Sequence, residues 1–175
     1  YDINSGCFTT TGSWPASGAL KGYNDGPTNY GVGGGTARWT PDLFYGGTYR
    51  VSIWNVVHET NTSLAKVEVH HKNGVTEFTY DNQGGESGFL EIGEFEFDAG
   101  TSGYIEVIHE GEGFLRLNSV KYELLERGEQ GQRPVPGTGE EEPYPDYVTR
   151  EISTKEVSLP QTAADTVKIY VGPGK

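Results

Sequence analysis

The stretch WTPDLFYGGTYRVSIWNVV, residues 39–57, decides the fold of this chain. Its adjacent glycines, Gly46 and Gly47, predict a turn, and the ten residues after them alternate with the period of two that is typical of a β-strand. The two faces of this strand carry Tyr49, Val51 and Ile53 on one side and Arg50, Ser52 and Trp54 on the other. A strand of this length with one continuous apolar face is predicted to be central, because edge strands are usually short or charged.

Residues 39–41, Trp-Thr-Pro, predict a short strand that ends at the proline, because proline has no N–H to donate to a ladder. We interpret this short strand and the strand 48–57 as the spine of a β-sandwich. Trp39 and Trp54 are both assigned to its core.

The composition indicates an all-β protein of one ordinary domain plus additional chain. The 175 residues include 26 glycines, 11 tyrosines and 3 tryptophans, and there is no methionine. Glycine turns between β-branched and aromatic residues are typical of all-β folds, and no stretch has convincing helical periodicity.

The charge and hydropathy of the chain exclude two classes of partner. The formal net charge is −12, with acidic residues along the whole sequence, whereas phosphate binding needs clustered Lys and Arg. No apolar run approaches the roughly 20 residues that span a bilayer. We therefore expect neither nucleic acid nor membrane as a partner. Because the chain begins at Tyr1, without methionine or signal peptide, we expect a processed product or a piece of a longer polypeptide.

Alternating stretches recur along residues 1–127, separated by short turns. The strongest turn is Asn73-Gly74, since both residues accept positive φ, and it joins strands 65–72 and 75–80 into a hairpin. A change of phase within the last stretch predicts a bulge near Asn118-Ser119. With about eight or nine strands, the predicted fold is an antiparallel two-sheet β-sandwich of jelly-roll type. The single cysteine, Cys7, is predicted to be a small buried side chain.

The remainder of the chain has a different composition. Residues 128–148 contain four glycines, four prolines and an acidic triplet, which predicts a linker. Residues 149–175 contain one predicted strand, 166–171, and are interpreted as an extension or as the start of a neighbouring domain.

Residues 12–35, GSWPASGALKGYNDGPTNYGVGGG, predict a long glycine-rich loop, and loops of this length are often functional. Sugar recognition uses flat aromatic rings against pyranose C–H faces, with amides and carboxylates that bind the hydroxyl groups. The loop supplies both kinds of group, and the candidate carbohydrate-binding residues are Trp14, Tyr23, Asn24, Asp25 and Tyr30. The alternative for Trp14 is that it caps one end of the sandwich core.

Catalysis has little support in the sequence. Two of the four histidines, His70 and His71, are adjacent on a predicted strand and face opposite sides, and no nucleophile elbow, HExxH helix or phosphate loop is present. The chain is therefore expected not to be an enzyme, with a hidden hydrolase as the alternative. No cofactor is predicted; Asn4, Asp81 and Asn82 could hold a structural calcium ion, although turn formation explains these residues equally well.

The order of several short motifs resembles the carbohydrate-binding-like module found at the C-terminus of golvesin and in bacterial xanthan lyases. The matching pieces are Asp2-Ile3-Asn4, Gly12-Ser13-Trp14, Gly22-Tyr23, Tyr30, Ala37-Arg38-Trp39-Thr40-Pro41, Gly47-Thr48-Tyr49-Arg50-Val51, Trp54, Val69-His70-His71, Asp81-Asn82-Gln83, Leu90-Glu91-Ile92-Gly93 and Phe95-Glu96-Phe97-Asp98-Ala99-Gly100. Two positions depart from the family pattern. Phe89 stands where the family usually has tryptophan, and Asn118-Ser119-Val120 replaces an Asp-Ala-Val run.

This resemblance implies a secreted, multidomain protein that acts on polysaccharide outside the cell or at its surface. Our hypothesis is a non-catalytic module that binds polysaccharide or supports a neighbouring domain of the same chain. The alternative is a structural spacer, or an adhesion module that binds a protein. A net charge of −12 favours a neutral glycan, whereas the resemblance to xanthan lyases points to an acidic one.

Overall fold

The computed structural model describes residues 1–18, 20–134, 139 and 141–143 of the chain. These belong to a compact unit, Tyr1–Tyr144, and the second unit, Pro145–Lys175, is not described. The predicted strand 166–171 and the predicted extension 149–175 therefore lie outside the described residues. No helix within the described residues is long and apolar enough to cross a membrane.

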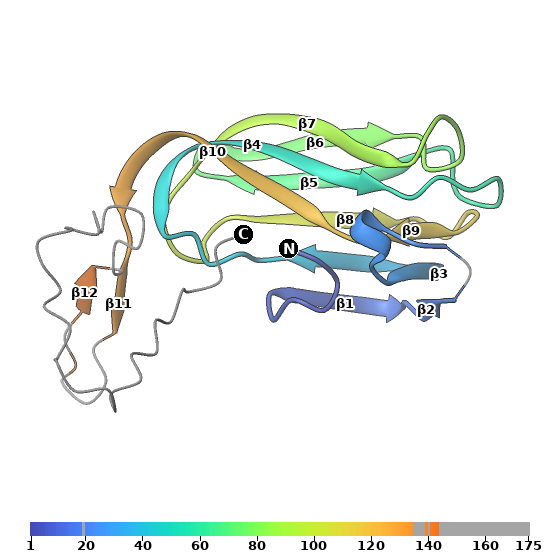
Figure 1. Ribbon diagram of the computed structural model, residues 1–175, viewed down its shortest axis with the longest axis horizontal. Helices are drawn as coiled ribbons and strands as arrows, with labels where there is room; N and C mark the ends of the chain where they lie inside the picture. The colour runs from blue at the N-terminus through green and yellow to red at the C-terminus, as the bar shows by residue number, and fades with distance from the viewer. Residues whose placement is uncertain (19, 135–138, 140, 144–175) are drawn as a thin grey trace, which may run out of the picture. The chain divides into compact units, whose positions relative to one another are not determined.

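Two antiparallel sheets build the domain, as the sequence predicted (Figure 1). The larger sheet has the order β1-β3-β8-β5-β6, and two short strands, β2 and β9, also pair with β3. Its strands are β1 (Phe8–Ser13), β2 (Ala16–Ser17), β3 (Thr28–Trp39), β5 (Ala65–His71), β6 (Gly74–Tyr80), β8 (Tyr104–His109) and β9 (Leu115–Leu117). The smaller sheet has the order β10-β4-β7 and consists of β4 (Tyr45–Asn55), β7 (Gly88–Phe97) and β10 (Val120–Gln130).

The core lies between the inner faces of the two sheets. The predicted inward face of β4 is confirmed, because Tyr49, Val51 and Ile53 are all buried. They pack in one cluster with Trp39 of β3 and Phe97 of β7. Trp39 ends β3 in the larger sheet and residues 48–55 belong to β4 in the smaller sheet, so the two predicted spine segments meet across the core. Thr40 and Pro41 lie outside the strands, and Gly46 and Gly47 lie within β4 and not in the predicted turn.

Trp39 is fully buried, as predicted, but Trp54 is not a core residue. Trp54 lies on the outer face of β4, on the same side as Arg50, and its side chain is half-buried there by other aromatic rings. Its neighbours come from β7 and from a distant turn, so the local pattern of β4 could not reveal them.

The segment 12–35 is not one long loop. It contains the end of β1, β2, a short 3₁₀ turn η1 (Tyr23–Asp25) and the first part of β3, which is twelve residues long. Many of its glycines allow strands to approach closely: Gly35 has a φ of 137°, and a Cβ there would overlap the carbonyl of Thr11. A Cβ at Gly31 would press into Trp14 and His109. The glycines of this segment thus allow close packing of strands and do not form the predicted long loop.

The predicted domain boundary at Arg127 lies within a strand. β10 continues to Gln130, which pairs with Tyr45, and a hairpin of β11 (Gln132–Pro134) and β12 (Glu141–Pro143) lies within the predicted linker. Near residues 118–119 there is no bulge within one strand. The chain leaves the larger sheet at the end of β9 and enters the smaller sheet at the start of β10.

The Asn73-Gly74 turn is as predicted, and it joins β5 and β6 in register, with His71 opposite Gly74. Cys7 is half-buried, packs against the core and lies 3.2 Å from the hydroxyl of Ser5.

Candidate binding groove on the smaller sheet

Three aromatic side chains meet on the outer face of the smaller sheet. Trp54 of β4 and Phe89 of β7 are register neighbours, with ring centroids 5.1 Å apart. Tyr23 of η1 packs on both, at 5.3 Å from Trp54 and 5.0 Å from Phe89. We call these three residues the aromatic triad. Tyr23 is its most accessible member, with 46% of its surface exposed.

The turn that carries Tyr23 is held by Asn118, at the crossing from β9 to β10. The Tyr23 N–H donates to Asn118 Oδ1 over 2.9 Å, and Asn118 Nδ2 donates to the carbonyl of Pro27 over 2.7 Å. Gly22 is essential to this approach, since a Cβ there would overlap the Asn118 side chain. The turn is therefore a short, hydrogen-bonded support that presents its residues to solvent.

Asn24 and Asp25 follow Tyr23 in this turn, and both are exposed. Both have positive φ values, 52° and 56°, which asparagine and aspartate tolerate better than most residues. The predicted trio Tyr23, Asn24 and Asp25 thus stays together at the rim of the triad.

An open groove of 640 Å³ lies beside the triad. Its lining residues are Tyr1, Asp2, Ser5, Tyr23, Asn24, Gly26, Phe89, Asn118, Ser119, Val120, Lys121 and Tyr122. Lys121 brings a positive charge to the groove, with Nζ 5.2 Å from the ring centroid of Phe89. The groove therefore combines aromatic surface, an amide, a carboxylate and an ammonium group, which suits a polyhydroxylated ligand better than an apolar one.

Phe89 and Lys121 line the groove and Trp54 packs on Tyr23 beside it, but none of the three was predicted as a binding residue. One signal was available: Trp54 was placed on the polar face of its strand, beside Arg50 and Ser52, where a large ring needs a partner outside the core. The partnership with Phe89 depends on strand pairing and could not be read from local sequence.

The other two predicted binding residues lie elsewhere. Trp14 is only 9% exposed, and its indole N–H donates to the carbonyl of Thr11 over 2.8 Å, which matches the alternative that it caps the core. Tyr30 of β3 packs edge-on against Phe114 at 5.4 Å. No ring contact joins either residue to Tyr23 in the described part of the chain.

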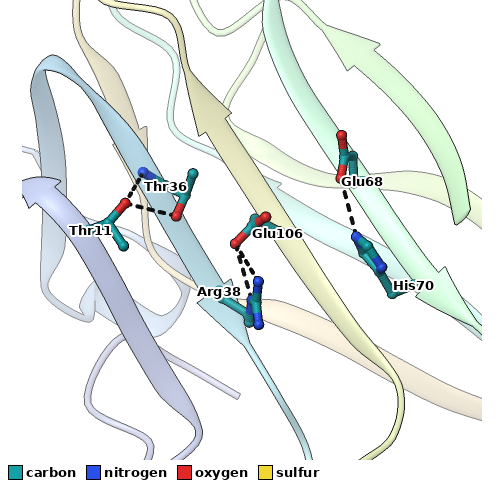
Figure 2. A network of polar contacts seen from close by, with 6 residues as sticks. All are labelled: Thr11, Thr36, Arg38, Glu68, His70 and Glu106. Atoms are coloured by element: carbon teal, nitrogen blue, oxygen red, sulfur yellow. Dashed lines mark hydrogen bonds and ion pairs between the residues drawn. The ribbon is translucent and has the colours of Figure 1, made fainter.

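The outer face of the larger sheet is occupied by ion pairs rather than by an open aromatic surface. Figure 2 shows Arg38 bound to Glu106 and His70 bound to Glu68, with distances of 2.9 and 3.1 Å. The nearby Tyr104 ring stacks on His70 at 4.0 Å and lies 4.1 Å from the guanidinium of Arg38. Since these neighbours cover the ring, Tyr104 offers no free face to a sugar.

The residues considered for calcium make hydrogen bonds within the protein. Asn82 is buried, donates to Asn55 Oδ1 over 2.7 Å and accepts from the N–H of Arg116 over 3.0 Å. Asp81 accepts from the N–H groups of Gln83 and Gly84, which closes a turn. Among the described residues, no group of three or more His, Cys, Asp or Glu side chains is placed to hold a metal ion.

The fold and the groove together define a small all-β sandwich domain with a ligand-sized depression on one sheet. Residues 2–121 match the golvesin C-terminal domain family, and the chain belongs to that family. The resemblance seen in the sequence motifs is thereby confirmed.

The chain is similar to part of two xanthan lyases. Xanthan lyase of Bacillus sp. (strain GL1) is 27% identical over 132 residues, which cover 69% of this chain and 14% of that protein. The solved structure of Paenibacillus xanthan lyase shares the fold, with a TM-score of 0.66 at 21% identity, over 71% of this chain and 13% of that one. The chain thus spans only a small part of the length of each of these relatives.

Proposed function

We propose that this chain is a non-catalytic carbohydrate-binding module of a secreted, multidomain polysaccharide-active protein, and that the groove beside the aromatic triad binds the glycan. The observation that carries the proposal is the exposed Tyr23 ring, fixed by Trp54 and Phe89 at the rim of the groove. The similarity to one segment of a xanthan lyase supports an accessory role beside a neighbouring catalytic domain, outside the cell.

In this role the triad provides the apolar contact and the flanking polar groups provide orientation. A ring covered by a sugar contributes about 1–3 kcal/mol from buried area, which falls short of the roughly 8 kcal/mol of a micromolar complex, so the polar contacts must supply the rest. In this proposal Trp54 supports the Tyr23 ring, Asn24 and Lys121 bind hydroxyl groups from the lining of the groove, and the exposed Asp25 does so from beside it. Because the turn is hydrogen-bonded before any ligand arrives, little ordering is required on binding.

One observation favours the alternative of a spacer or protein-binding module. The triad rings are tilted at 56° to 87° to each other rather than coplanar, and Trp54 and Phe89 are half-buried. Only Tyr23 presents a large free surface. The two functions therefore predict different effects on polysaccharide binding when the Tyr23 ring is removed.

The test is retention of the 175-residue chain in affinity gels that contain xanthan, a neutral β-glucan or no polysaccharide, with and without calcium. Tyr23→Ala is expected to abolish most of the retention, whereas Tyr23→Phe keeps the ring and most of the binding. Val75→Ala, which removes an exposed apolar side chain of β6 outside the groove, is the matched control. Full retention of Tyr23→Ala, or no retention of the native chain on any polymer, would favour the spacer.

A further inference from the structure

A buried arginine lies away from the groove, on the outward side of β9. Leu115 and Leu117 point into the core, so Arg116 between them points out, opposite Tyr30 of β3. Its side chain is nevertheless only 8% exposed, because the segment 58–64 folds over it. Backbone hydrogen bonds of 3.1 and 2.7 Å, from Phe114 N–H to Thr60 and from Thr62 N–H to Phe114, fasten that segment in place.

Two rings and two neutral oxygens surround the guanidinium. Its central carbon lies 5.9 Å from the ring of Tyr30 and 5.5 Å from that of Phe114. Nη1 donates to Asn61 Oδ1 and lies 3.4 Å from the hydroxyl of Thr60. Nε is buried and has no hydrogen-bond partner within the described residues.

Arg38 of β3 and Arg50 of β4 differ from Arg116 in that they pair with carboxylates. Arg38 binds Glu106, and Arg50 lies within 4 Å of three glutamates. Arg116 makes no ion pair with any carboxylate of the described residues, although the chain carries a net charge of −12. A guanidinium removed from water and left without an anion is costly, so an anion that reached Arg116 would be stabilised there. Desolvation also lowers the pKa of Arg116 below its ordinary value, which an arriving anion would reverse.

We propose that Arg116 is a carboxylate-binding subsite of this module, and that it selects acidic polysaccharides through the carboxylate of a uronic acid residue. The planar guanidinium matches a carboxylate in a paired hydrogen-bond geometry, and the half-buried Tyr30 ring lies beside it to contact the sugar. Thr60 is exposed and its hydroxyl lies 3.4 Å from Nη1, so a ligand would reach the guanidinium beside Thr60 by displacing part of segment 58–64.

This proposal rests on the proposed function. It also accounts for two opposed indications in the sequence, since the net charge favours a neutral glycan and the resemblance to xanthan lyases points to an acidic one. An acidic polymer is repelled by the acidic surface as a whole, but a local desolvated cation attracts one carboxylate strongly at short range. The module would then recognise an acidic polymer at one buried point rather than through a basic surface.

The experiment compares xanthan with carboxyl-reduced xanthan, which has the same backbone without the charge. Arg116→Gln is expected to weaken binding to xanthan about tenfold or more, the loss typical of one charge-assisted contact, and to leave binding to the reduced polymer unchanged. Arg116→Lys keeps the charge but loses the planar pair of donors, so its affinity for xanthan is expected to lie between those of the native chain and Arg116→Gln. Equal binding of native chain and folded variants to xanthan would overturn the subsite.

A second measurement stands independently of folding and of polymer binding. In ¹⁵N NMR spectra of the native chain, glucuronate is expected to shift the Arg116 Nε–H signal, whereas glucose at the same concentration is not. A shift with glucuronate but unchanged retention of Tyr23→Ala would keep the subsite and refute the groove. The absence of any glucuronate-specific shift would refute the subsite and leave the groove to its own test.

Discussion

At the scale of single residues, the structure depends on close approaches that few side chains permit. Gly22 lets Asn118 reach the Tyr23 turn, and Asn118 uses both ends of its amide there. An aspartate at 118 could accept from Tyr23 but could not donate to Pro27, so the asparagine in this chain is explained by its hydrogen bonds.

The buried surroundings of His109 change its pKa, and this predicts how the free energy of unfolding depends on pH. It is buried under Trp14, its Nε2 has no hydrogen-bond partner among the described residues, and burial lowers the pKa of His109 below its ordinary value of 6.5. The unfolded chain therefore takes up a proton near pH 6.5, whereas the folded chain does so only at lower pH. The free energy of unfolding should consequently fall as the pH drops below about 6.5.

The measurement is urea unfolding of native chain and His109→Phe at pH 7.5 and at pH 5. The variant cannot titrate at this position and should lose less stability between the two values than the native chain. Val75→Ala, which removes an exposed side chain that does not titrate, is the control and should keep the native dependence. An identical pH dependence for His109→Phe and the native chain would mean that His109 titrates normally.

At the scale of elements, strand β4 contributes both to the stability of the core and to the candidate binding site. Its inner face supplies Tyr49, Val51 and Ile53 to the core, while Trp54 on its outer face supports the triad. Alternation along one strand thus assigns stability to one side and the candidate site to the other.

Ile53→Ala tests the core side of β4. Ile53 is 1% exposed, so truncation should lower the free energy of unfolding by about 2–5 kcal/mol, through lost burial and a cavity. Val75→Ala on β6, where the side chain is 53% exposed, should change it by less than about 0.5 kcal/mol. Chemical denaturation measures both, and a loss below about 1 kcal/mol for Ile53→Ala would contradict its burial in the core.

At the scale of the whole molecule, the question is where the independently folding domain ends. β10 passes Arg127, Gln130 pairs with Tyr45, and Gly131 N–H donates to the carbonyl of Phe44 over 2.8 Å. The compact unit reaches Tyr144. The smaller sheet has only three strands, so the last residues of β10 contribute noticeably to it.

Two truncations test this boundary. A chain ending after Tyr144 should fold alone with a cooperative thermal transition, and a chain ending after Arg127 should fold with stability lower by about 1–3 kcal/mol, because a few backbone hydrogen bonds are lost. Circular dichroism and thermal unfolding measure both. An unfolded 1–144 chain would refute the assignment of the unit, and equal stability of the two would place the boundary at Arg127.

The sequence by itself determined the all-β class, the two-sheet sandwich, the inward face of β4 and the Asn73-Gly74 hairpin. These depend on the period of two and on turn chemistry, which act between near neighbours in the chain. The family motifs also persist in the sequence, in order.

Only the tertiary structure decided which of the aromatic residues meet. Tyr23, Trp54 and Phe89 are far apart in sequence, and Arg116 lies beside Tyr30 and Asn61 only because β9 pairs with β3 and segment 58–64 crosses it. Likewise, glycines in 12–35 resembled loop residues until strand packing showed which backbones they bring together. Such contacts depend on sheet pairing and burial, and these are properties of the whole fold rather than of any local stretch.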